Sequence, residues 1–122
     1  MLHHVALEIS PDDIEEEERF WELAGFERVA VPEALGDGYT WLEKAGTQIH
    51  LMHVDDPVIP ARGHVAIISR DFEKTLARLV EGGFEPVEGR RLWGDRRVKV
   101  TSPGGHRVEV MASPPSRRAL SA

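Results

Sequence analysis

The sequence predicts an α+β fold that consists of two copies of one strand–helix–strand–strand–strand module. The segment HVAL at residues 4–7 returns as HVAI at residues 64–67, about 60 residues later. Two further landmarks recur in the same order and at a similar offset: GFE at 25–27 returns at 83–85, and IHLM at 49–52 aligns with VEVM at 108–111. A constant order and offset indicate an internal duplication, and two copies indicate paired modules.

Length and composition are those of one globular domain. The chain has 122 residues, of which 41% are hydrophobic and 30% charged, which is enough for a hydrophobic core. The net charge of −6 argues against binding to nucleic acid or to an anionic membrane, since both need a basic surface. The absence of cysteine excludes disulfides and thiolate chemistry. Because the sequence has no apolar leader and no long apolar run, we expect a cytoplasmic protein.

The first module is expected over residues 1–55. Residues 2–9 alternate apolar and polar side chains, which predicts a half-buried strand. Ser10 favours the start of a helix that runs to Ala24, and the acidic run 15–18 is interpreted as the solvated face of this helix. The helix residues expected in the core are Ile14, Phe20, Trp21 and Ala24. The remaining strands of this module are predicted over 26–31, 39–44 and 47–54.

The second module repeats this plan over residues 62–113, after a proline-containing linker at 56–61. Its first strand is predicted over 63–69, and its helix over 71–81, where a pair of glycines follows. The helix residues expected to be buried are Phe72, Leu76, Leu79 and Val80. The last three strands are predicted over 84–88, 95–102 and 106–112. The proline-broken tail at 114–122 is expected to fray.

Four side chains that can bind a metal occupy repeat-related positions on the predicted strands. The duplication pairs His4 with His64, and His50 with Glu109. Alternation places each of them on the face opposite the aliphatic residues of its strand. If the helices cover the aliphatic faces, the four side chains point into the concave face, where a pseudo-two-fold axis would bring them to one centre. The remaining histidines of strands and turns are interpreted as ordinary polar residues: His3, His53 and His106.

The same residues resemble a known family. The motifs HVAL, FWELAGF, GHVAI and SPGGHRVEVM are similar to those of the vicinal oxygen chelate superfamily, over about residues 2–113. That superfamily includes glyoxalase I, fosfomycin-resistance transferases, methylmalonyl-CoA epimerase, extradiol dioxygenases and bleomycin-resistance proteins. The resemblance implies a glyoxalase-like fold, in which paired βαβββ modules form a curved mixed sheet around a metal cavity, with the helices on the outer face. It implies the metal ligands His4, His50, His64 and Glu109, and a homodimer with its sites at the subunit interface.

The ligand set favours a particular chemistry. Three imidazoles and one carboxylate suit a divalent Zn, Ni, Co, Mn or Fe ion. A six-coordinate ion would keep two adjacent positions for a small-molecule substrate that chelates through neighbouring oxygens, and none for dioxygen unless His50 stays off the metal. The leading hypothesis is a lyase or isomerase in which the metal stabilises an enolate and Glu109 is the catalytic general base.

Alternation also predicts which residues surround the substrate. On strand 39–44, Trp41 would face the cavity and wall an apolar or aromatic group. On strand 95–102, Arg97 and Lys99 would face the cavity and hold an anionic group. The alternative is a packing tryptophan beside a solvated basic hairpin.

Other functions remain open at this point. Within the enzymes, the alternatives are thiol transfer of the fosfomycin-resistance type and a dioxygenase reaction. A metal-free, drug-binding protein of the bleomycin-resistance type is an alternative of a different class. Four intact ligands argue against that class, because a sequestering pocket has no use for them. The metal content of untagged protein would distinguish the two classes.

Overall fold

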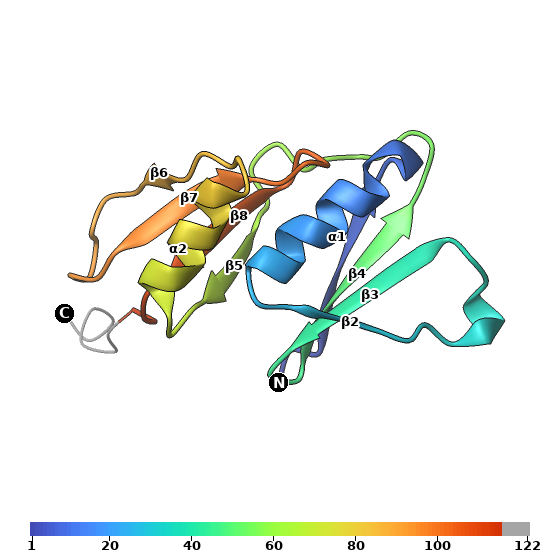
Figure 1. The fold of residues 1–122 in the computed structure, drawn as a ribbon, viewed down its shortest axis with the longest axis horizontal. Coiled ribbons are helices and arrows are strands. Elements are labelled where there is room, and N and C mark those ends of the chain that lie inside the picture. The colour runs from blue at the N-terminus through green and yellow to red at the C-terminus, as the bar shows by residue number, and fades with distance from the viewer. Residues whose placement is uncertain (116–122) are drawn as a thin grey trace.

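The computed structural model describes residues 1–115 and shows the predicted order of elements (Figure 1). The tail predicted to fray lies, from position 116 on, outside these residues. The first module contains β1 (His4–Ile9), a 3-10 turn η1 (Pro11–Asp13), α1 (Ile14–Leu23), β2 (Glu27–Val29), a 3-10 turn η2 (Glu33–Leu35), β3 (Tyr39–Lys44) and β4 (Thr47–His53). The second module contains β5 (Val65–Ile68), α2 (Phe72–Glu81), β6 (Val87–Glu88), β7 (Arg97–Thr101) and β8 (Arg107–Met111).

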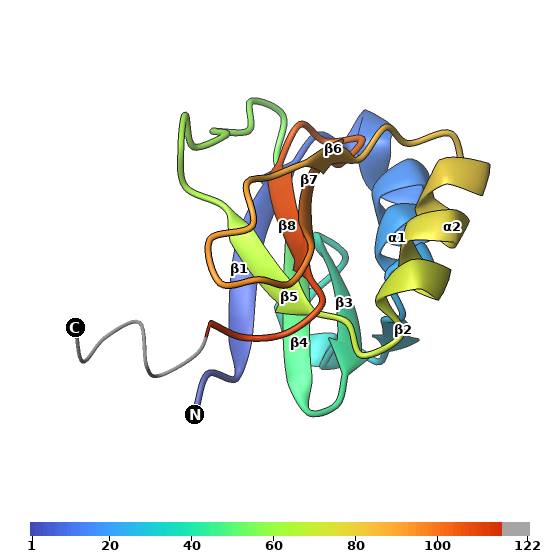
Figure 2. The ribbon, with the colours of Figure 1, turned by 90° about the vertical axis from the view of Figure 1, so that its left-hand side faces the viewer.

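The α+β class with paired modules is confirmed. Each module forms a four-stranded mixed sheet, in the order β1-β4-β3-β2 or β5-β8-β7-β6, in which the first strand runs parallel to the last. Both helices lie on the same side of the two sheets (Figures 1 and 2). The strands within residues 1–115 make two sheets and no closed barrel, because β1 and β5 are both edge strands and are not hydrogen-bonded to each other.

Alternation along the strands places the aliphatic side chains under the helices. Ile49 and Leu51 of β4 are buried, and Val108 and Val110 of β8 are buried at the corresponding positions. The fully buried side chains of the helices include Phe20, Trp21 and Leu79. One hydrophobic cluster runs through both modules, so they share a core.

One predicted core residue of α2 is exposed. Val80 leaves 57% of its surface exposed, and Thr75 is buried instead. Because a helix turns by about 100° per residue, Phe72, Thr75 and Leu79 form one stripe and Val80 lies beside it. The Thr75 hydroxyl lies 2.7 Å from the Ser69 hydroxyl, so this buried polar group has a partner.

The acidic run of α1 contains a buried carboxylate, so the prediction that the whole run is solvated is wrong. Glu17 is 0% exposed and accepts hydrogen bonds from Nε1 of Trp21 at 2.9 Å and from the backbone N–H of Gly104 at 2.7 Å. Gly104 belongs to the turn between β7 and β8, so this carboxylate joins the two modules. Glu15 and Glu16 are exposed, as predicted.

Two further contacts tie the modules together. His106 is buried, and its Nε2 lies 2.7 Å from the carbonyl oxygen of Glu8 in β1, which gives this histidine a structural role. Phe20 of α1 and Phe84, which follows α2, pack edge to face with ring centroids 5.0 Å apart. The β7–β8 turn and the aromatic contact between α1 and the segment after α2 therefore fix one sheet relative to the other.

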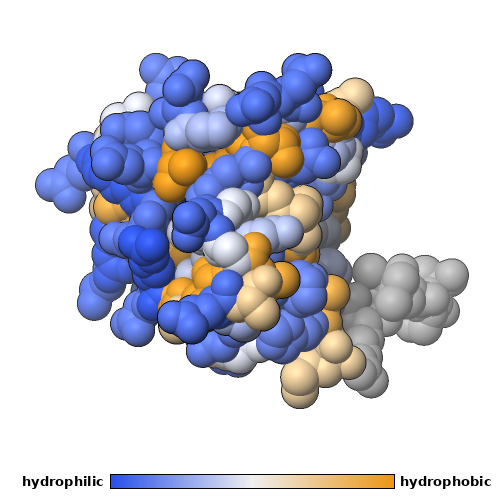
Figure 3. Space-filling model, turned by 90° about the vertical axis from the view of Figure 1, so that its right-hand side faces the viewer, coloured by the Kyte–Doolittle hydropathy of each residue, from blue (hydrophilic) through white to orange (hydrophobic). Residues whose placement is uncertain are grey.

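The surface of this fold is mixed in character. The face drawn in Figure 3 is mostly hydrophilic, with apolar patches among the polar side chains. The two α-helices of residues 1–115 have ten residues each. Within the described part of the chain, no helix combines the length and the apolar character that crossing a bilayer requires.

We expect Glu17→Ala to lower the free energy of unfolding by about 2–4 kcal/mol, because the buried indole N–H of Trp21 and the partly buried N–H of Gly104 lose their acceptor. Glu16→Ala removes an exposed carboxylate from the same helix and should stay within about 0.5 kcal/mol of the parent. Urea denaturation, monitored by circular dichroism, measures the free energy of unfolding of both variants. Equal losses in the two variants would show that Glu17 does not hold the modules together.

Candidate metal centre

His64 and Glu109 lie together at the edge of the second sheet. Glu109 of β8 is opposite Ala66 of β5, and His64 immediately precedes β5. Nε2 of His64 lies 3.3 Å from Oε1 of Glu109, and Nδ1 of His64 lies 3.1 Å from the carbonyl oxygen of Arg62. Since a carbonyl oxygen only accepts, Nδ1 carries the proton of this second contact.

When His64 is neutral, its contact with Glu109 brings two acceptor atoms together. With its proton on Nδ1, a neutral His64 has a lone pair on Nε2, and an ionised Glu109 can only accept. Such atoms repel at 3.3 Å unless a positive charge lies between them, either a proton on Nε2 or a metal ion. Bonds of about 2.0–2.2 Å to one ion place neighbouring donor atoms about 3.0–3.5 Å apart. The observed separation therefore fits two ligands of one divalent ion.

His4 and His50 form the corresponding pair on the first sheet. Their rings stack with centroids 3.9 Å apart, and the Trp41 ring stacks on His50 at the same centroid distance. His50 of β4 is opposite Trp41 on one neighbouring strand and Ala6 on the other, so the register places it between them. Nδ1 of His3 lies 3.0 Å from Nδ1 of His4. Three imidazoles and one indole thus gather on this sheet.

A chain of hydrogen bonds fixes the protonation of His50. The side-chain amide of Gln48 donates through Nε2 to Oε1 of Glu43 at 2.9 Å, since a carboxylate only accepts. Oε1 of Gln48 then accepts from Nε2 of His50 at 2.7 Å. The other ring nitrogen of His50, Nδ1, keeps the lone pair that a metal ligand needs.

Burial keeps His50 neutral. Desolvation, together with the charges that His4 and His3 would carry, lowers the pKa of His50 to about 4. His50 is therefore uncharged at pH 7, which is the form of imidazole that binds a metal.

The structure brings the four predicted ligands together as two pairs and not as one cluster. Within residues 1–115, no group of three His, Asp or Glu side chains lies close enough to hold one ion. Ala6 of β1 lines both the pocket beside His4 and His50 and a second pocket beside His64. Ala6 therefore lies between the two pairs, which we call half-sites, and each half-site contains two of the predicted ligands.

The pocket beside His4 and His50 is apolar. It has a volume of about 300 Å³, and its walls include Leu35, Trp41 and Met52. Trp41 thus lies at the pocket that alternation predicted for it. Leu35 comes from the turn η2, where a strand pattern gives no signal, so sequence reasoning missed it.

The pocket beside His64 and Glu109 is cationic. It has a volume of about 190 Å³, and its walls include Arg62, Lys99 and Arg107. Lys99 lies where alternation predicted it. Arg107 was missed although it lies two residues before Glu109 on the same strand and so shares its face. Arg62 lies outside the strands, where alternation carries no information.

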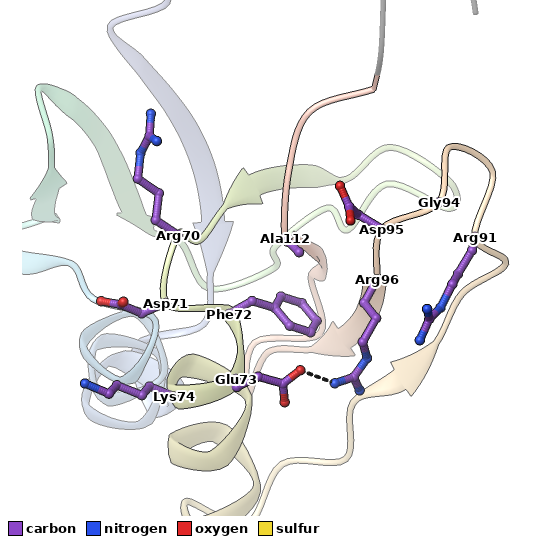
Figure 4. Close-up of a pocket in the computed structure, with 10 residues that line it drawn as sticks. All are labelled: Arg70, Asp71, Phe72, Glu73, Lys74, Arg91, Gly94, Asp95, Arg96 and Ala112. Atoms are coloured by element: carbon purple, nitrogen blue, oxygen red, sulfur yellow. Dashed lines mark hydrogen bonds and ion pairs between the residues drawn. The ribbon is translucent and has the colours of Figure 1, made fainter.

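A larger open pocket lies elsewhere, at the start of α2, and none of the four predicted ligands lines it (Figure 4). Its volume is about 480 Å³. Arg96 forms ion pairs with Glu73 and Glu88, and its guanidinium carbon lies 5.1 Å from the centre of the Phe72 ring. Figure 4 shows the Arg96–Glu73 pair inside the pocket. These contacts join α2 to β6 and β7, which is a structural role.

Comparison with known proteins identifies the family. The sequence model of the Glyoxalase/Bleomycin resistance protein/Dioxygenase superfamily matches residues 1–110. The chain belongs to this superfamily. The membership predicted from the four sequence motifs is thereby confirmed. Among curated protein sequences, none matches the chain significantly.

Several solved structures share the fold. A glyoxalase family protein from Bacillus anthracis has a TM-score of 0.81 at 24% identity, over 91% of this chain and 93% of that one. The fosfomycin resistance protein FosX from Listeria monocytogenes has a TM-score of 0.78 at 20% identity, over 100% and 98% of the two chains. Lactoylglutathione lyase from Agrobacterium tumefaciens has a TM-score of 0.65 at 19% identity, over 91% and 92%. At these identities the similarity establishes the fold.

Acid should destabilise the metal-free protein through His50. In the unfolded chain the His50 side chain takes up a proton at about pH 6.5. In the folded protein it does so only at about pH 4. The unfolded state therefore binds more protons between these values, and the free energy of unfolding should rise with pH there. His50→Gln removes this contribution and should flatten the rise between about pH 4.5 and 7. His3→Gln, at an exposed neighbour, should keep most of it. Urea titrations with a chelator present measure all three proteins, and identical slopes would contradict the neutral, buried His50.

Proposed function

We propose that this chain is a metal-dependent lyase or isomerase that acts on a small substrate chelated through two neighbouring oxygens. The observation that carries the proposal is the 3.3 Å separation of Nε2 of His64 and Oε1 of Glu109, which fits two ligands of one ion. His4 and His50 would complete a ligand set that suits Zn, Ni, Co, Mn or Fe. A structure of a FosX variant that contains Mn(II) supports a divalent ion in this fold.

The residues would divide the chemistry among them. When bound, the ion would supply a Lewis acid beside a carbonyl of the substrate. Oε2 of Glu109 contacts Arg97, so Oε1, the oxygen beside His64, would take the proton from the neighbouring carbon, and Oε1 would have to leave its place as a ligand for this step. Trp41 and the apolar pocket around it would bind the carbon skeleton and exclude water from the reacting carbon.

The two pockets support a substrate with an apolar part and an anionic end. Arg62, Lys99 and Arg107 put three positive charges beside one ligand pair, where a carboxylate, phosphate or phosphonate would be attracted. Trp41 lines the pocket beside the other pair. Arg97, also predicted to bind an anion, already contacts Glu109 within its own chain.

The cationic pocket favours one alternative reaction, the transfer of a thiol to a small phosphonate. A FosX variant has been solved with 1S,2S-dihydroxypropylphosphonic acid, so a phosphonate is bound in a protein of this fold. The chain has no cysteine, and the thiol would therefore be a co-substrate. Consumption of fosfomycin only when a thiol is added would favour this alternative over a lyase or isomerase.

Metal analysis tests the leading proposal. Protein purified without a histidine tag should bind a divalent ion, and His64→Ala should weaken that binding at least about tenfold, because a direct ligand is lost. His3→Ala is the matched control and should bind the ion as the parent does. Elemental analysis and titration with Mn(II) or Zn(II) measure both effects.

Other outcomes of the same analysis point to the other functions. A parent protein without stoichiometric metal, but with tight binding of a bulky cationic drug, would support the drug-binding class. Oxygen uptake with catechols would support a dioxygenase. Equal metal affinity in the parent and His64→Ala would remove His64 from the ligand set.

We also propose that a second copy of the chain completes each site. The two ligand pairs stay apart within residues 1–115, and neither pair alone supplies enough donors for one ion. A two-fold dimer would place the His4–His50 pair of one subunit against the His64–Glu109 pair of the other, and it would do so twice. The edge strands β1 and β5 would lie at this interface.

Mixing two defective variants tests the shared site. His50→Ala and His64→Ala should each bind metal weakly, but in their heterodimer one of the two sites keeps all four ligands. After unfolding and refolding an equal mixture, about a quarter of the parent's metal capacity should return, because random pairing makes half of the dimers heterodimers. A site built within one chain would give no recovery, and each variant refolded alone is the control.

A further inference from the structure

Arg97 is held by groups of its own chain. Its Nη1 lies 3.3 Å from Oε2 of Glu109, and its Nε donates to the carbonyl oxygen of Arg90 at 2.8 Å. Its guanidinium carbon lies 5.7 Å from the centre of the Trp93 ring. Since the Arg97 side chain is only 14% exposed, these contacts take the place of most of its hydration.

The strand register accounts for the contact between Arg97 and Glu109. β7 and β8 are antiparallel, with Arg97 opposite Met111 and Lys99 opposite Glu109. Arg97 and Glu109 are therefore diagonal neighbours on one face of the sheet, a separation that a long side chain spans. Lys99 is exposed and lines the cationic pocket. Arg97 is not among the described residues that line this pocket.

The two oxygens of Glu109 have different partners. Oε1 lies 3.3 Å from Nε2 of His64, and Oε2 lies 3.3 Å from Nη1 of Arg97. Rotation of the carboxylate would break the ion pair with Arg97, and the Glu109 side chain is only 9% exposed, so water would replace that pair poorly. The ion pair therefore keeps Oε1 directed at His64.

We propose that Arg97 is a positioning residue for Glu109 and does not bind the substrate. The inference rests on the proposed function, in which Glu109 is a metal ligand. Arg97 holds Oε2, so that Oε1 is presented to the ion that Glu109 shares with His64. Lys99 is left as the strand residue that meets an anionic substrate group. The Arg97 guanidinium also donates to the carbonyl oxygen of Arg90, in the loop before β7. Arg97 therefore links this loop to the orientation of Glu109.

Metal affinity in the absence of any substrate tests this role. Arg97→Gln removes the charge and should weaken Mn(II) or Zn(II) binding about 10- to 100-fold, as expected for loss of a group that orients a ligand. Arg97→Lys keeps the charge but cannot hold Glu109 and the Arg90 carbonyl together, so its affinity should lie between those of Arg97→Gln and the parent. Lys99→Gln is the matched control on the same strand face and should change metal affinity less than about twofold.

A spectroscopic measurement separates positioning from a loss of folding. The visible absorption of Co(II)-loaded protein reports the ligand geometry of the ion, and it should change in Arg97→Gln and stay as in the parent in Lys99→Gln. Circular dichroism confirms that each variant is folded, and Arg97→Lys carries the test if Arg97→Gln does not fold.

The outcomes distinguish this inference from the proposed function. If the parent binds metal and Arg97→Gln binds it equally well with an unchanged Co(II) spectrum, Arg97 does not position Glu109, while the metal site stands. An increase in KM for an anionic substrate without a change in metal affinity would return Arg97 to the substrate-binding residues. If the parent itself binds no divalent ion, the proposed function and this inference both fail.

Discussion

The alternation of side chains along the strands is the constraint on which the candidate site depends. Val108 and Val110 pack under the helical layer, and this forces Glu109, between them, to the opposite face. Ile49 and Leu51 do the same for His50. A slip of one residue in either strand would turn the ligand into the core and the aliphatic residues into water. Hydrophobic packing thus fixes the face on which the candidate ligands lie, whatever contacts they make themselves.

The two modules share this geometry and differ in the chemistry of their walls. His50 lies opposite Trp41, whereas Glu109, at the corresponding position of the second module, lies opposite Lys99. One half-site therefore has an aromatic, apolar surface and the other a cationic one. If the two half-sites form the proposed shared site, its two ends differ in chemistry and would hold an asymmetric substrate in a single orientation.

The faces of the strands could be predicted from the sequence because alternation is a local property. Contacts between distant segments could not. Glu17 resembles its solvated neighbours, since its partner Gly104 lies 87 residues away. Arg97 was placed on the correct face, but a diagonal contact with Glu109 depends on the register of two strands. The division of the ligands into two pairs depends on how the modules dock, and the repeat carries no information about that.

The turn that holds Gly104 and His106 makes the two halves of the molecule unequal. In the first module, β3 and β4 are joined by the two residues between them, and Gly46 there borders open space in the described chain. In the second module, a Cβ added at Gly104 would lie 2.9 Å from Oε1 of Glu17 and 3.0 Å from a methyl carbon of Ile9. The second module supplies this turn, and the first module supplies the groups that it contacts. The two copies of the repeat are therefore not interchangeable in this fold.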